Sequence, residues 1–172
     1  MLLRPALPTD VDLLTDLVVE AVNWTGEQRV TVADVRTDDH LARYVEGWGR
    51  PGDVGVVAVG DAGEPLGAAW VRLLTADRAG WGFVAEDVPE LSLGVLAPGR
   101  GLGAGSALLD ACLDAVRAQG SRAVSLSVED GNDLARGMYE RRGFVVVGRE
   151  GGSDVLLLDL ATSTTPAGRQ KV

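Results

Sequence analysis

Apolar residues recur along the chain with the two periods that distinguish strands from helices. Alternating or continuous apolar runs predict strands at 1–7, within 53–74 as a hairpin, and at 90–96, 123–128, 144–148 and 155–160. Helical spacing predicts helices over 9–24, 104–119 and 132–143, with a further helical patch near 38–48. The order of these segments predicts a mixed α/β domain in which the strands at 90–96 and 123–128 run parallel.

The segment 104–119 illustrates how the pattern separates core from surface. Its apolar residues recur at helical spacing and predict one buried face, made of Leu108, Leu109, Cys112, Leu113 and Val116. Gly120 follows at the position typical of a helix C-cap. We therefore interpret Cys112 as a core residue rather than a nucleophile.

Chain length and net charge limit the number of domains and the kinds of partner that are expected. A chain of 172 residues without a visible linker predicts one domain over 1–160, followed by a mobile polar tail at 161–172. The net charge of −9 argues against a nucleic-acid partner. An acidic surface could attract a cationic substrate such as an amine, but solubility alone is the better supported reason for it.

The reactive side chains are few. One cysteine excludes an internal disulfide, and one histidine, His40, leaves no cluster for a structural metal, so we expect no metal. No signal peptide and no apolar run of membrane-spanning length are visible, so a cytoplasmic protein without a membrane partner is expected.

The stretch RGLGAGSALL, residues 100–109, concentrates three glycines where a helix begins. Bare backbone N–H groups at a helix N-terminus can hold a phosphate or pyrophosphate, and Arg100 can add a charged contact. A tight turn without a ligand is the alternative. The glycine spacing differs from a dinucleotide fingerprint, and the one lysine, Lys171, is too distant for a P-loop.

Two motifs in this order resemble the GNAT superfamily of N-acetyltransferases. RGLGAG, residues 100–105, is similar to its Arg/Gln-x-x-Gly-x-Gly/Ala motif, and NDLARGMYERRGF, residues 132–144, is similar to its Asn-x-x-Ala-x-x-x-Tyr-x-x-x-Gly-Phe segment. The resemblance implies a central mixed, mostly antiparallel twisted sheet, with two splayed parallel strands and helices on both faces. Segments 22–50 and 75–88 match nothing in the family pattern.

The resemblance also implies a site for acetyl-CoA, used as co-substrate. The pyrophosphate would lie on the glycine loop and the pantetheine along the strand 90–96, near Asn132, with the Val95 N–H polarising the thioester carbonyl. The implied cofactor-binding residues are Leu93, Val95, Arg100, Gly101, Leu102, Gly103, Ala104, Gly105, Ser106, Asn132 and Tyr139.

Two residues are candidates for proton transfer. The resemblance implies that Tyr139 is the general acid for the departing thiolate, whereas a plain helix pattern would make it a core residue. Glu90 is the candidate base for the acceptor amine, although it could be a solvated acid at a strand end. Weaker candidates for the base are Glu86, Asp87 and Glu129. Since no activated nucleophile is evident, we expect direct transfer in a ternary complex.

The acceptor is an amine, of a small molecule or of a protein, that the sequence does not identify. The tryptophans could line its pocket by cation–π contact or could be packing residues; they are Trp24, Trp48, Trp70 and Trp81. Two alternatives remain open, a catalytically silent acyl-CoA-binding sensor and a nucleotide-binding α/β domain. The family resemblance is compatible with a homodimer.

Overall fold

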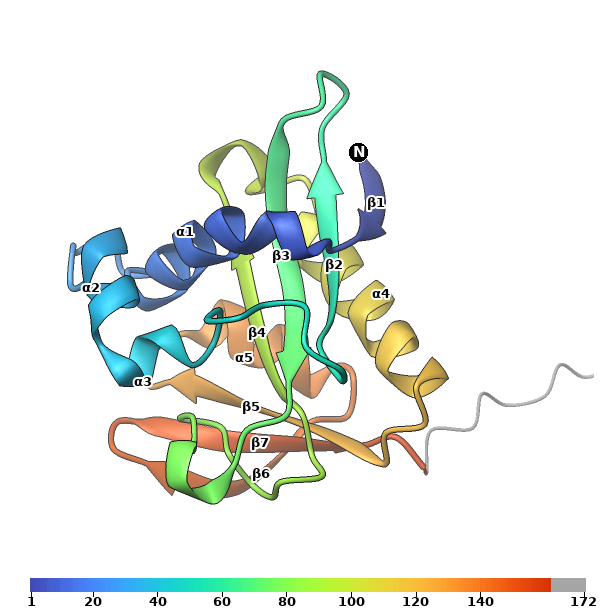
Figure 1. Cartoon of the computed structure of the whole chain (residues 1–172). Coiled ribbons are helices and arrows are strands. Elements are labelled where there is room, and N and C mark those ends of the chain that lie inside the picture. The colour runs from blue at the N-terminus through green and yellow to red at the C-terminus, as the bar shows by residue number, and fades with distance from the viewer. Residues whose placement is uncertain (162–172) are drawn as a thin grey trace, which may run out of the picture.

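A computed structural model describes residues 1–161 as a twisted sheet with helices on both faces (Figure 1). The strands are β1 (Leu2–Pro5), β2 (Val54–Val59), β3 (Pro65–Arg72), β4 (Glu90–Val95), β5 (Ala123–Glu129), β6 (Val145–Glu150) and β7 (Ser153–Asp159). The helices are α1 (Val11–Val22), α2 (Val32–Thr37), α3 (Asp39–Ala42), α4 (Ala104–Ala118) and α5 (Asp133–Glu140). The expected tail lies outside the described residues from 162 onward.

The seven strands are ordered β1-β2-β3-β4-β5-β7-β6, and every neighbouring pair except β4 and β5 is antiparallel. This confirms the predicted mixed, mostly antiparallel sheet. The predicted strands and the three long helices are all present, within a few residues of their expected ends. Helix α2 is the element that the sequence pattern did not predict.

Two hydrophobic cores cover the two faces of the sheet. One face packs against α1–α3, where Leu14, Leu17 and Trp70 are fully buried. The other packs against α4 and α5, and the predicted apolar face of α4 is buried there in full. Figure 1 shows α1 crossing in front of the strands and α4 behind them. Cys112 is fully buried in the second core, which confirms that it is a core residue, and this burial raises the pKa of its thiol to about 12.

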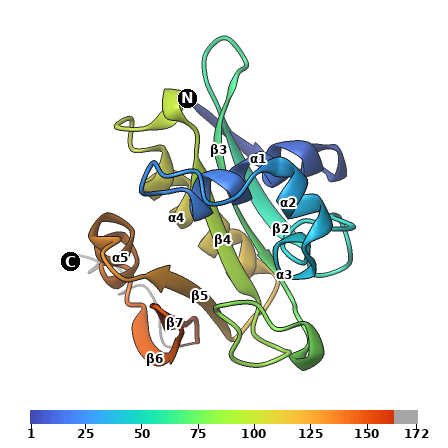
Figure 2. The same ribbon diagram turned by 90° about the vertical axis from the view of Figure 1, so that its left-hand side faces the viewer.

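The parallel pair β4 and β5 separates almost as soon as it forms. The register contains one residue pair, Glu90 with Ser125, next to a hydrogen bond from the Ser125 N–H to the Pro89 carbonyl. Figure 2 shows the two strands meeting at this point and diverging beyond it. Beyond Glu90, β4 therefore has one edge that pairs with β3 and one edge that is open toward β5.

A buried ion pair fastens the segment after α3 to the end of β3. The Arg72 guanidinium donates to both carboxylate oxygens of Asp53 at 3.0 Å and also to the carbonyls of Arg43 and Glu46. Both charged side chains are about 2–3% exposed. Because these contacts fix the chain around residues 43–53, they also fix Tyr44, which reaches the candidate active site.

Candidate active site

The glycine loop leaves the backbone N–H groups at the start of α4 without acceptors in the described part of the chain, while the Arg100 and Leu102 N–H groups donate to the Ala97 and Gly99 carbonyls at 3.3 and 3.4 Å. Gly101 and Gly103 both have φ of +76°, a conformation that favours glycine, and a Cβ at either position would meet nothing within 4 Å. Gly103 is the N-cap of α4 and provides no side-chain cap. The first helical bond runs from the Ala107 N–H to the Gly103 carbonyl, so the preceding N–H groups lack helical acceptors. The loop can therefore bind an anion.

Three segments of the predicted site meet around Gly105. A Cβ there would lie 3.5 Å from Val95 Cγ2, 3.6 Å from Met138 Sδ and 3.9 Å from Leu93 Cδ2. The end of β4, the start of α4 and the middle of α5 are thus in contact. Both sequence motifs consequently lie at one place in the fold.

An arginine links the two helices of this site. Arg142 donates to both carboxylate oxygens of Asp110 on α4, at 2.5 and 2.8 Å, and to the Ser106 carbonyl at 3.1 Å. It also donates to the Met138 carbonyl on α5 at 2.9 Å. This bidentate contact holds α5 against the first turns of α4.

The backbone of β4 presents donors along its open edge. The Leu96 N–H donates to the Leu66 carbonyl at the start of β3, whereas the Pro89 carbonyl accepts from β5. Backbone groups alternate in direction along a strand, so the N–H groups of Leu93 and Val95 face the open side. This is the orientation that the pantetheine prediction requires.

Arg100 is engaged within the protein. Its Nη2 lies 2.5 Å from Glu20 Oε2 on α1, and its Nε donates to the Val95 carbonyl at 3.3 Å. The guanidinium is therefore tied between α1 and β4, where it joins the loop to two elements. The Arg100 guanidinium would have to release Glu20 or the Val95 carbonyl before it could contact an anion on the loop.

The two motif residues of α5 have different surroundings. Asn132 is the N-cap and its Oδ1 accepts from the Ala135 N–H at 3.3 Å. Tyr139 is 6% exposed and packs edge-on against Phe144, with ring centroids 5.7 Å apart. Burial alone raises the Tyr139 pKa to about 12, and within residues 1–161 no group hydrogen-bonds to its hydroxyl. The phenol is therefore protonated at neutral pH and available as a donor.

Glu90 is buried at the point where β4 and β5 part. Its Oε1 accepts from the Tyr44 hydroxyl and from the Gly82 N–H, both at 2.8 Å. Its Oε2 is buried and has no hydrogen-bond partner in the described part of the chain. Burial raises the pKa of this carboxyl, and the two hydrogen bonds together with Arg43 oppose that shift. A carboxylate with a raised pKa and one free oxygen is suited to accept a proton.

The loop 79–84 covers Glu90, and the sequence motifs did not indicate it. A Cβ at Gly82 would lie 2.5 Å from the Leu126 carbonyl carbon, and one at Gly80 would overlap Glu90 Oε2. Tyr44 binds the loop from the other side, because its hydroxyl accepts from the Trp81 N–H at 2.8 Å. The pair of glycines flanking Trp81 was the available clue to this close packing.

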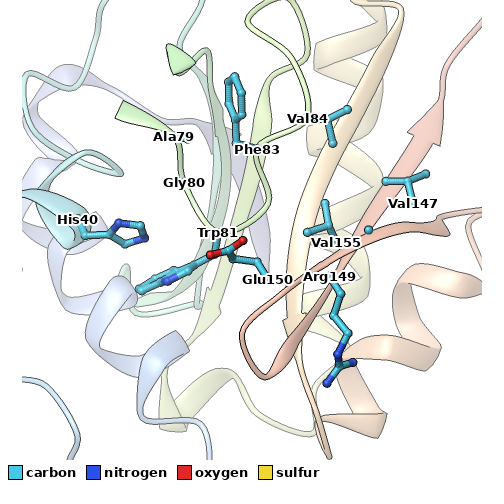
Figure 3. A pocket seen from close by; sticks show the side chains of 11 residues that line it. His40, Ala79, Gly80, Trp81, Phe83, Val84, Val147, Arg149, Glu150 and Val155 are labelled. Atoms are coloured by element: carbon cyan, nitrogen blue, oxygen red, sulfur yellow. The ribbon is translucent and has the colours of Figure 1, made fainter. Parts of the chain in front are cut away.

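A cleft of about 470 Å³ lies between this loop and the β6–β7 hairpin (Figure 3). Trp81 lines this cleft, in agreement with one of the two roles that the sequence left open for the tryptophans, pocket lining or packing. Trp48 and Trp70 are core residues, 8% and 0% exposed, so the interpretation of these two as pocket residues is wrong. Trp24 lies elsewhere and donates to Glu129 Oε2 at 2.6 Å.

The weaker base candidates are engaged in other contacts. Glu86 accepts from the Ala76 N–H, Asp87 pairs with Arg122, and Glu129 pairs with Arg29. Among residues 1–161, no group of three or more His, Cys, Asp or Glu side chains could hold a metal ion. No helix in that same range is long and apolar enough to cross a membrane.

Comparison with known proteins gives a family match over most of the chain. A model described as the acetyltransferase (GNAT) family matches residues 13–144. A mycothiol acetyltransferase from Propionibacterium freudenreichii subsp. shermanii is 35% identical over 115 residues, which cover 67% of this chain and 35% of the relative. The chain spans between 34% and 45% of the length of four curated relatives, which all carry that name.

Solved structures have the same fold. A ribosomal-protein-alanine N-acetyltransferase from Brucella melitensis matches with a TM-score of 0.67 and 21% identity, over 93% of this chain and 100% of that one. An acetyltransferase from Salmonella typhimurium, solved with its cofactor acetyl-CoA, matches with a TM-score of 0.66 and 23% identity, over 96% and 97%.

Proposed function

Because the chain belongs to the GNAT acetyltransferase family, we propose that it transfers the acetyl group of acetyl-CoA directly to a primary amine. One observation carries the proposal: the open edge of β4 leads straight into a glycine loop and an uncapped helix N-terminus. A linear molecule with an amide-containing arm and a pyrophosphate matches these two sets of donors in sequence. The same geometry supports acetyl-CoA over a compact nucleotide.

Residues 100–106 would hold the pyrophosphate, chiefly by the backbone N–H groups of residues 103–106, since the Arg100 and Leu102 N–H groups already donate to the Ala97 and Gly99 carbonyls. Gly101 and Gly103 leave open space where other residues would place a side chain. The N-terminal end of the α4 dipole adds a favourable field for the negative charge. Asn132 caps α5 at the far side of the opening and lies within the proposed path of the pantetheine.

The carbonyl of the thioester needs one N–H donor close to the base. Val95 is five residues from Glu90, about 17 Å along a strand, whereas Leu93 is three residues away, about 10 Å. We therefore assign the polarising N–H to Leu93 and leave the Val95 N–H to the pantetheine. This assignment revises the role that the family pattern alone suggested for Val95.

The proton balance uses the two candidate residues. The amine nitrogen attacks the carbonyl carbon, the C–N bond forms, and the C–S bond breaks. Glu90 takes the proton that the nitrogen loses, directly or through a water, on Oε2, which is buried and has no partner in the described chain. Tyr139 donates its hydroxyl proton to the departing thiolate.

A small-molecule acceptor is favoured over a protein. The four curated relatives are named for mycothiol, a small molecule, although this chain matches under half of their length. The acceptor would enter through the cleft beside the loop 79–84, whose lining residue Gly80 packs against Glu90 Oε2.

Initial rates of CoA release test this proposal when acetyl-CoA and a primary amine are both varied. We expect release to depend on the amine and reciprocal plots to intersect, since both substrates must be bound together. Parallel plots would indicate an acetylated enzyme and overturn direct transfer. Binding of acetyl-CoA without release for any amine would support the silent sensor instead.

A further inference from the structure

The cleft beside the loop 79–84 has an unequal distribution of charge. Three of its lining residues can carry a charge, namely His40, Arg149 and Glu150. The other walls are largely apolar and include Trp81, Val84, Val147 and Val155. The charge that the cleft offers to a ligand therefore depends on how these three residues are paired.

Arg149 is neutralised by two carboxylates. Its guanidinium pairs with Asp154 Oδ1 at 2.8 Å and also with Asp130. In Figure 3 its side chain points away from Trp81 and His40. Arg149 consequently adds no free positive charge to the cleft.

His40 is uncharged at neutral pH. Its ring lies against Trp81, with centroids 4.5 Å apart, and burial together with Arg43 lowers its pKa, against the opposing effects of Asp38 and Glu150. Trp81 is also stacked on Tyr44, at 5.6 Å. The indole is thus held between two rings and forms a fixed apolar wall.

Glu150 differs from Arg149 and His40 because it offers a charge to the cleft that no other described side chain neutralises. It ends β6 at the mouth of the cleft, and among the described residues it has no ion-pair or hydrogen-bond partner. Figure 3 shows its carboxylate directed toward Trp81. Gly80, which lines the same cleft, lies directly over the free Oε2 of Glu90. The cleft therefore has an unpaired carboxylate at its mouth, apolar walls, and the proposed base beneath its floor.

We infer that the acceptor carries a second cationic group besides the reacting amine, and that Glu150 binds this second cation. The inference rests on the proposed function, because it assumes that the reacting amine is placed near Glu90. A diamine with an aliphatic linker has the required chemistry: its methylene groups contact the apolar walls while its outer ammonium group meets the carboxylate. A terminal carboxylate in that position would meet like charge.

Three acceptors of equal length test the inference with acetyl-CoA as donor: pentane-1,5-diamine, pentylamine and 5-aminopentanoate. Because Glu150 is exposed, we expect kcat/KM to be about two- to five-fold higher for the diamine than for pentylamine, the size of a surface ion pair, and lowest for the aminocarboxylate. Glu150→Gln should remove the advantage of the diamine and leave pentylamine unchanged. Glu140→Gln is the matched control, because Glu140 is an exposed residue of α5 outside the cleft.

The outcomes separate the two claims. Equal turnover of all three acceptors, or a diamine preference that survives in Glu150→Gln, overturns the inference and leaves the acetyltransferase proposal in place. Binding of acetyl-CoA with turnover of none of the three also overturns the inference. A protein that neither binds acetyl-CoA nor acetylates any amine overturns the proposed function itself.

Discussion

Replacing Glu90 by glutamine removes the proposed proton acceptor and keeps the shape of the side chain. The amide oxygen can still accept from the Tyr44 hydroxyl and the Gly82 N–H, which hold Oε1 at 2.8 Å in the native protein. The amide nitrogen takes the place of the buried, unpartnered Oε2. An unsatisfied buried donor costs about 1–3 kcal/mol, so we expect the variant to fold.

The expected loss lies in the chemical step. A positioned general base contributes about 10²–10⁴-fold, which corresponds to roughly 2.7–5.4 kcal/mol in the activation barrier. The assay is the pH dependence of kcat/KM for CoA release. Because burial raises the pKa of Glu90, the native rate should rise with pH above the ordinary carboxyl range, as the carboxylate forms. In Glu90→Gln, the rise of kcat/KM with pH that reflects ionisation of Glu90 should be missing. The rise that reflects deprotonation of the amine substrate should remain.

A nearby glutamate provides the matched control. Glu86 lies between the loop 79–84 and β4, is exposed, and accepts only from the Ala76 N–H at 3.0 Å among the contacts described. Glu86→Gln should keep native activity. A folded Glu90→Gln variant that retains its rate within a few-fold, or an equal loss in Glu86→Gln, would refute the assignment of the base.

Three further predictions concern the general acid, the glycine loop and the fold. Tyr139→Phe should lower kcat by about 10²-fold or more without weakening acetyl-CoA binding or stability, since no described group bonds to the hydroxyl; an unchanged kcat would contradict its role. Gly105→Ala should raise the free energy of unfolding by about 0.5–1 kcal/mol in thermal melts and keep acetyl-CoA binding, because a methyl group meets only ordinary contacts there. Gly103→Asn should retain the positive φ, but its side chain would occupy the open space at the loop and weaken acetyl-CoA binding in calorimetry. Equal affinity in Gly103→Asn and Gly105→Ala would argue against the loop as the pyrophosphate site. Asp53→Ala leaves Arg72 buried without its counter-charge and should cost about 3–5 kcal/mol in urea unfolding; a loss below about 1 kcal/mol would show that the pair is not structural.

The strands and long helices could be predicted because each has a regular apolar period of its own. Helix α2 was missed because it has six residues and one fully buried side chain, Val35, too few to establish a period. It depends instead on a capping box between Thr31 and Asp34 and on packing against α1 and α3. Short elements of this kind are fixed by tertiary contacts.

The candidate site likewise contains residues that local motifs predict and residues that only tertiary contacts bring together. The glycine loop and the α5 motif are local in sequence, so their residues could be proposed from the sequence alone. The surroundings of Glu90 come from Tyr44 and the loop 79–84, which approach from distant parts of the chain. For Trp48 and Trp70 the sequence left core and pocket open, because an aromatic residue has the same sequence signature in both, and the structure places these two in the core.

Thermal melts with acetyl-CoA, CoA, NAD and ATP test the central claim most directly, because all four ligands contain a pyrophosphate linkage and only two contain pantetheine. At a hundred-fold excess over Kd, a bound ligand stabilises the fold by about 2.7 kcal/mol. For a domain of this size the melting temperature should rise by roughly 5–11 °C. We predict this shift with acetyl-CoA and CoA alone. No shift with either CoA species, or a larger one with NAD or ATP, would contradict the acetyl-CoA site.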